Sequence, residues 1–122
     1  MKPEFVHATR ALAEAFYGRP APRSFRGWVV LLDKKPVGIG GLYTDGGYPM
    51  AFSDLKEELR PHRGALIHGV GLMRKMLRDI KVPVFAAANP DEGTAPRLLA
   101  HLGFKSVGVD TPDGALFMRP PE

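Results

Sequence analysis

The sequence predicts an α/β (α+β) protein with a mixed, mostly antiparallel central sheet and helices on both faces. Three apolar, β-branched runs lie between residues 28 and 55 and are separated by short turns, which is typical of an antiparallel meander. A long amphipathic helix pattern follows, and after it strand-like runs flank a second, shorter helical one. A meander followed by strand–helix–strand favours one sheet that is covered by helices on both faces.

The first predicted element is an amphipathic helix over residues 3–17. Apolar residues recur there at helical spacing: Phe5, Ala8, Leu12 and Phe16. Gly18, followed by Pro20 and Pro22, ends this helix. We find no counterpart of an earlier strand in this pattern, so the fold is expected to begin with the helix.

Three strands are predicted next, over residues 28–32, 37–43 and 48–55. Asp33 to Pro36 turns the chain between the first two strands. Asp45-Gly46 predicts a type I′ hairpin turn before the third, because these residue types tolerate the positive φ that such a turn needs.

The second half of the chain contains two predicted helices and three predicted strands. The longer helix covers residues 63–79, and its sheet-facing positions should be Leu66, Val70, Met73 and Leu77. A buried strand over residues 82–88 and a loop over 89–93 follow. Thr94 should cap a short helix over residues 95–102, which Gly103 ends in the left-handed conformation. Two last strands are predicted over 104–109 and 115–118.

Length and composition favour one globular domain that spans residues 1–122. Hydrophobic residues make up 44% of the chain and charged residues 25%. The apolar runs are far shorter than the ~20 residues of a membrane helix, and the N-terminus has no apolar signal segment. The absence of cysteine excludes disulfides and a cysteine nucleophile, and it fits a cytoplasmic protein.

The net charge of +4 indicates an anionic partner. Basic residues gather in the middle of the chain: Arg60, Arg63, Arg74, Lys75, Arg78 and Lys81. This cluster fits a phosphorylated cofactor, a nucleic acid or simply a solvated helix face. Nucleic-acid binding is the least favoured of the three, because no aromatic residue is interleaved between residues 60 and 81. The spacing of the histidines predicts no metal site.

Three segments resemble the GNAT superfamily, whose members transfer acyl groups from acyl-coenzyme A (acyl-CoA) to amines. The segment Lys35-Pro-Val-Gly-Ile-Gly-Gly-Leu42 is similar to a strand of that family, and Arg60-Pro-His-Arg-Gly-Ala65 stands where the family has its pyrophosphate loop. Thr94 to Phe104 resembles its late helix, which ends in Leu-Gly-Phe. The resemblance implies acetyl-CoA as cosubstrate and a small-molecule or protein amine as acceptor. Whether the chain forms a homo-oligomer is left open at this point, and no membrane partner is expected.

The loop before the long helix is the candidate cofactor site. A helix N-terminus offers unpaired N–H groups and about half a positive charge, which attract phosphate. The candidate cofactor-binding residues are Arg60, His62, Arg63, Gly64 and Ala65. The family's loop has glycine where this chain has Arg63. The arginine side chain either narrows the space for phosphate at the helix start or binds phosphate itself. The alternative is a basic helix start without a ligand.

The strand before this loop carries the candidate catalytic residues, Asp54 and Ser53. Amine acetylation needs a base that removes a proton from the ammonium group, and family bases often stand on this strand. The alternative is that both residues only shape the turn. The family's acid, a tyrosine on the late helix, corresponds here to Leu99, which cannot donate a proton; Tyr43 and Tyr48 can replace it only if they face the cleft.

Two interpretations of function therefore stand side by side. The first is an acyl-CoA-dependent N-acetyltransferase with reduced activity, whose cleft lies between the strands at 48–55 and 82–89. The second is a catalytically inactive GNAT-like binding or structural protein, for example a virion-associated protein encoded by a phage. The pairing of Arg63 for glycine with Leu99 for tyrosine favours the second interpretation.

Overall fold

A computed structural model gives the architecture and describes residues 2–20, 23–88 and 95–121, with the backbone alone for Ala95. Its strands form a seven-stranded sheet in the order β1-β2-β3-β4-β5-β7-β6. The strands are β1 (Glu4–His7), β2 (Phe25–Leu32), β3 (Lys35–Tyr43), β4 (Met50–Leu55), β5 (Val84–Ala88), β6 (Lys105–Thr111) and β7 (Gly114–Arg119). The pairings are antiparallel except for β4 with β5, so the predicted fold class is confirmed. The predicted loop over 89–93 and the Thr94 cap lie outside the described residues.

The N-terminal prediction of a helix over 3–17 is wrong in its first half. Residues Glu4–His7 form β1, which pairs with β2 through Phe5↔Val30 and Val6↔Val29. The helix α1 covers only Arg10–Tyr17, because the Thr9 hydroxyl caps it by accepting the Leu12 N–H at 3.1 Å. The prediction that no strand precedes the helix is therefore wrong as well.

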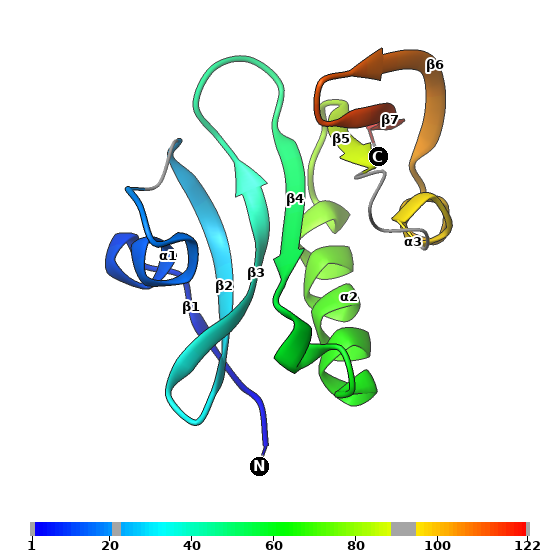
Figure 1. Ribbon diagram of the computed structural model, residues 1–122. Coiled ribbons are helices and arrows are strands. Elements are labelled where there is room, and N and C mark those ends of the chain that lie inside the picture. The colour runs from blue at the N-terminus through cyan, green and yellow to red at the C-terminus, as the bar shows by residue number, and fades with distance from the viewer. Residues whose placement is uncertain (1, 21–22, 89–94, 122) are drawn as a thin grey trace.

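The helices cover both faces of the sheet, as predicted (Figure 1). On one face, Ala13 and Phe16 of α1 pack against Val29 and Ile39. On the other face lie α2 (Arg63–Arg78) and α3 (Ala95–His101). A 3₁₀ turn, η1 (Glu57–Leu59), joins β4 to α2.

The face of α2 that was predicted to meet the sheet does so. Met73 and Leu77 are buried in the core beside Leu42 and Phe104. Nearer the start of the helix, Leu66 packs against a second buried group, while Val70 lines a cavity. The sheet-facing residues of α2 therefore serve two purposes. Those in its C-terminal half fill the core, and those in its N-terminal half form part of the wall of the cavity.

Two turns differ from the sequence expectation in their detail. The tight turn lies between β2 and β3, where Asp33 and Lys34 both have positive φ. The connection after β3 is longer than a two-residue type I′ turn and extends from 44 to 49. Arg23 binds both the carboxylate of Asp45, at 2.9 Å, and its carbonyl, at 3.3 Å, which ties that residue to the loop before β2 instead.

The glycines of β3 make room for side chains of neighbouring elements. A Cβ at Gly40 would lie 2.5 Å from the Trp28 ring, so the indole can lie flat over this strand only because residue 40 is glycine. Trp28 packs against the α2 side of the core and borders the site described next. Among the described residues, no helix is long and apolar enough to cross a membrane.

Candidate active site

The two central strands β4 and β5 diverge after a single point of contact. Met50 and Phe85 form the one parallel register pair, and the Phe85 N–H donates to the Pro49 carbonyl at 3.1 Å. Beyond this point β4 continues to Leu55 without further pairing to β5. The facing backbone edges of both strands are therefore left without their usual ladder partners, and such edges readily accept an extended ligand with amide groups.

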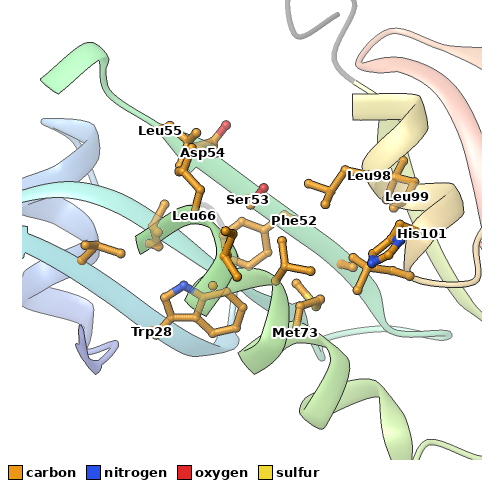
Figure 2. A pocket seen from close by; sticks show the side chains of 18 of the residues that line it. Trp28, Phe52, Ser53, Asp54, Leu55, Leu66, Met73, Leu98, Leu99 and His101 are labelled. Atoms are coloured by element: carbon orange, nitrogen blue, oxygen red, sulfur yellow. The ribbon is translucent and has the colours of Figure 1, made fainter. Parts of the chain in front are cut away.

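A cavity of about 620 Å³ lies where the strands diverge. This size suits a cofactor-sized ligand, for which pockets of roughly 300–1,000 Å³ are usual. Figure 2 shows Ser53 and Asp54 of β4 on one side and Leu98 and Leu99 of α3 across from them. The wall is mostly apolar, and the ionisable side chains that line it are those of Asp54, Arg97 and His101. The cleft predicted between the strands at 48–55 and 82–89 is thus confirmed.

The two candidate catalytic residues lie on opposite faces of β4. Ser53 pairs with Gly40 and therefore shares the α2 face with Trp28, whereas Asp54 pairs with Ile39 on the α1 face. Both residues line the cavity and both are exposed. The cavity is therefore bordered by the Ser53 hydroxyl on one face of β4 and by the Asp54 carboxylate on the other.

Tyr17 does not line the cavity but contacts Asp54, which does, and the sequence analysis did not find this contact. Its hydroxyl donates to Oδ2 of Asp54 at 2.7 Å. Burial, followed by the hydrogen bond to Asp54 and the carboxylate charge, raises the pKa of Tyr17 far above its usual value of 10, so the phenol stays protonated. The pKa of Tyr43 is also raised, mainly by burial and then by the charge of Asp54.

The five candidate cofactor residues surround the start of α2. The Ala65 and Leu66 N–H groups donate to the His62 carbonyl, whereas the Gly64 N–H has no acceptor among the described residues. A Cβ at Gly64 would meet nothing within 4 Å, so the space beside this residue is open. His62 stands at the N-cap without a side-chain capping bond, and Arg63 is exposed beside it.

Two members of this group have other contacts as well. Arg60 donates from Nε to the Glu57 carboxylate at 3.1 Å, which neutralises part of its charge. Ala65 packs against the buried group around Leu59 and lines the cavity. The start of α2 therefore adjoins the cavity directly, and of the two arginines there, Arg60 pairs with a carboxylate whereas no ion pair of Arg63 is found among the described residues.

The candidate acids fall in different places. Leu99 is half-buried and lines the cavity, so a proton donor at that position would face the cleft. Tyr43 does not line the cavity; its ring stacks on Phe52 at 4.3 Å, and the Arg23 guanidinium lies 4.5 Å from its centroid. Tyr48 is 59% exposed and is not part of the cavity wall either.

Comparison with solved structures identifies the fold family of this architecture. The chain aligns over 99% of its length with 95% of the ribosomal-protein-S18-alanine N-acetyltransferase of Escherichia coli, at a TM-score of 0.62 and 12% identity. A GNAT-family acetyltransferase of Staphylococcus aureus matches with 99% and 100% coverage, a TM-score of 0.62 and 11% identity. This protein has the GNAT fold.

A further structure of the GNAT fold was solved with ligands. The aminoglycoside acetyltransferase AAC(6')-Ib, in complex with coenzyme A and kanamycin, matches with 98% and 95% coverage, a TM-score of 0.61 and 17% identity. At these identities the likeness concerns the fold. No protein-family model and no curated protein sequence matches the chain. A relation to phage proteins is tested by none of these comparisons and stays a prediction.

Proposed function

We propose that this protein transfers an acetyl group from acetyl-CoA to the amino group of an acceptor. The observation that carries the proposal is the divergence of β4 and β5 over an apolar cavity that adjoins the start of α2. The pantetheine arm of coenzyme A carries amide groups, which suit the unpaired strand edges, and its phosphates suit a basic helix start. Complexes of AAC(6')-Ib with coenzyme A support this assignment.

The residues at the start of α2 hold the phosphates in this proposal. The Gly64 N–H, which has no acceptor among the described residues, supplies a donor, and the helix dipole adds positive potential. Arg63, which replaces the family's glycine, binds phosphate through charge-assisted hydrogen bonds. Arg60 and His62 contribute further positive charge or donors, and Ala65 leaves room beside the cavity.

Asp54 and Ser53 serve the acceptor and the acyl group. Acetyl-CoA supplies the acetyl thioester when bound. Asp54 takes the proton that the ammonium group must lose before its nitrogen can form the new C–N bond. Ser53, on the other face of β4, donates a hydrogen bond to the acyl group. The C–S bond breaks as the C–N bond forms, and Leu99 offers no proton to the departing thiolate.

Calorimetric titration with acetyl-CoA tests the binding half of the proposal. We expect a dissociation constant in the micromolar range or below. Ser53→Leu places a larger apolar side chain in the cavity and should weaken binding at least tenfold, whereas Ser106→Leu, the same change on the exposed strand β6, should leave it unaltered. Equal affinities for both variants would place the ligand elsewhere, and no heat of binding in the wild type would remove the proposal.

The second interpretation, a protein that uses the GNAT fold without catalysis, differs in one measurable respect. Such a protein either binds no acetyl-CoA or binds it and turns over no amine. The pairing of Arg63 for glycine with Leu99 for tyrosine favours this interpretation, and Leu99 leaves the cleft without an acid at that position.

A further inference from the structure

The contact between Tyr17 and Asp54 joins α1 to β4 at the cavity. The two residues are 37 positions apart in the chain, and the distance from the phenol oxygen to Oδ2 is 2.7 Å. Asp54 lies on the α1 face of the sheet because it pairs with Ile39, which packs against α1. Tyr17 is the last residue of α1 and is only partly buried, so its hydroxyl reaches the edge of the site.

The hydroxyl of Tyr17 is not needed to hold α1 in place. The helix is capped at its start by Thr9, ends at Gly18 in the left-handed conformation, and is anchored by Ala13 and Phe16 in the core. An exposed hydrogen bond of this kind contributes little to stability, because water can replace either partner. The bond instead restricts the orientation of the Asp54 carboxylate.

The charged and titratable groups around this pair come from several elements. Tyr43 of β3 adjoins the Tyr17 phenol, and the Arg23 guanidinium lies 4.5 Å from the centroid of the Tyr43 ring. Lys56 lies 5.0 Å above the Phe16 ring and Arg19 lies 5.8 Å from the Tyr17 ring. In the described part of the chain none of these cations forms an ion pair with Asp54. The Tyr17 hydroxyl is therefore the described side chain that holds the carboxylate.

We propose that Tyr17 is the positioning residue for Asp54: it binds Oδ2 and leaves Oδ1 turned toward the acceptor amine. The inference rests on the proposed function, in which Asp54 takes the ammonium proton. Burial and the nearby carboxylate keep the phenol protonated well above its usual pKa, so Tyr17 remains a donor throughout the pH range of an assay. Tyr17 itself exchanges no proton with the substrate.

A double-mutant cycle separates positioning from a merely structural role. Tyr17→Phe removes only the hydroxyl and should lower kcat about tenfold while the KM for acetyl-CoA stays unchanged. Asp54→Asn should lower kcat by about 10²-fold or more, because it removes the base. The double variant should be no slower than Asp54→Asn alone, since Tyr17 acts through Asp54. Tyr48→Phe, which removes an exposed phenol that is not part of the cavity wall, should be close to wild type.

Losses that add up in the double variant would overturn the proposal, because Tyr17 would then act independently of Asp54. So would a Tyr17→Phe variant with wild-type kcat. A rise in the KM for acetyl-CoA in Tyr17→Phe would also contradict the proposal and would assign Tyr17 to cofactor binding.

A second readout does not require turnover. In a background with both Tyr43→Phe and Tyr48→Phe, which leaves Tyr17 as the one tyrosine of the chain, tyrosinate absorbance is followed during a titration to high pH, with aspartate or asparagine at position 54. The carboxylate raises the pKa of Tyr17, so its ionisation should move to lower pH in the asparagine variant. An unchanged titration would overturn the proposal, because it would mean that the contact does not form in solution. A shifted titration together with no acetyl-CoA binding would leave the contact intact but remove the proposed function, and with it the catalytic purpose of the contact.

Discussion

Replacing Arg63 by alanine tests whether this side chain binds phosphate itself or only adds to the overall positive charge of the chain. Arg63 stands at the first position of α2, beside the Gly64 N–H, for which the described part of the chain offers no acceptor. A hydrogen bond to a charged group contributes about 1.5–3 kcal/mol, so its loss should weaken acetyl-CoA binding roughly 10- to 150-fold. Calorimetric titration gives this ratio directly.

Arg78→Ala is the matched control, because it removes the same charge from the other end of the same helix. The 16 residues of α2 extend over about 24 Å at 1.5 Å per residue, which is well beyond the ~8 Å Debye length at physiological salt. Arg78→Ala should therefore change the affinity less than twofold. Added salt should weaken the wild type more than Arg63→Ala. Equal losses in the two variants, or none in Arg63→Ala, would refute the assignment of the phosphates to this helix start.

Three further changes test the core and the cleft. Leu77→Ala should lower the free energy of unfolding by about 2–5 kcal/mol, because the side chain is 1% exposed. Ile67→Ala, on the exposed side of α2, should lower it by under ~0.5 kcal/mol. Urea denaturation measures both losses, and similar values would show that the predicted sheet-facing side of α2 is wrong. Gly40→Ala should cost about 1–3 kcal/mol in the same assay, since its Cβ would lie 2.5 Å from the Trp28 ring, and an unchanged midpoint would contradict that contact. Leu99→Tyr should speed thiol release from acetyl-CoA by restoring an acid at the cavity wall, where full acid assistance amounts to ~10²–10⁴-fold; a stable variant that binds acetyl-CoA but is no faster would refute the role of that position.

The elements that the sequence predicts well have long or strongly apolar patterns. The helix over 63–79 agrees with Arg63–Arg78, and the meander of three strands is present in the predicted order. The first strand was missed because four residues are too few to show a period of two. Phe5 also fits the helical spacing of Leu12 and Phe16 by coincidence. What makes Glu4–His7 a strand is its pairing with β2, which no local pattern reveals.

The candidate site was predictable in outline and not in its contacts. The position of the cleft followed from the resemblance to the GNAT superfamily, and Asp54 and Ser53 indeed line the cavity. That Arg63, or Arg60 with its partner Glu57, holds phosphate stays a prediction. The bond from Tyr17 to Asp54 connects segments 37 residues apart, and a single sequence carries no pattern for such a pair.

Amide formation is the measurement that tests the central claim most directly. The wild type and Asp54→Asn are incubated with acetyl-CoA and a panel of primary amines, and both free thiol and the acetylated amine are quantified. We predict that at least one amine yields thiol and amide in equal amounts, slowly in the wild type and about 10²-fold more slowly in Asp54→Asn. A wild-type protein that binds acetyl-CoA but acetylates none of the amines would contradict the account and would favour a GNAT fold retained for binding alone.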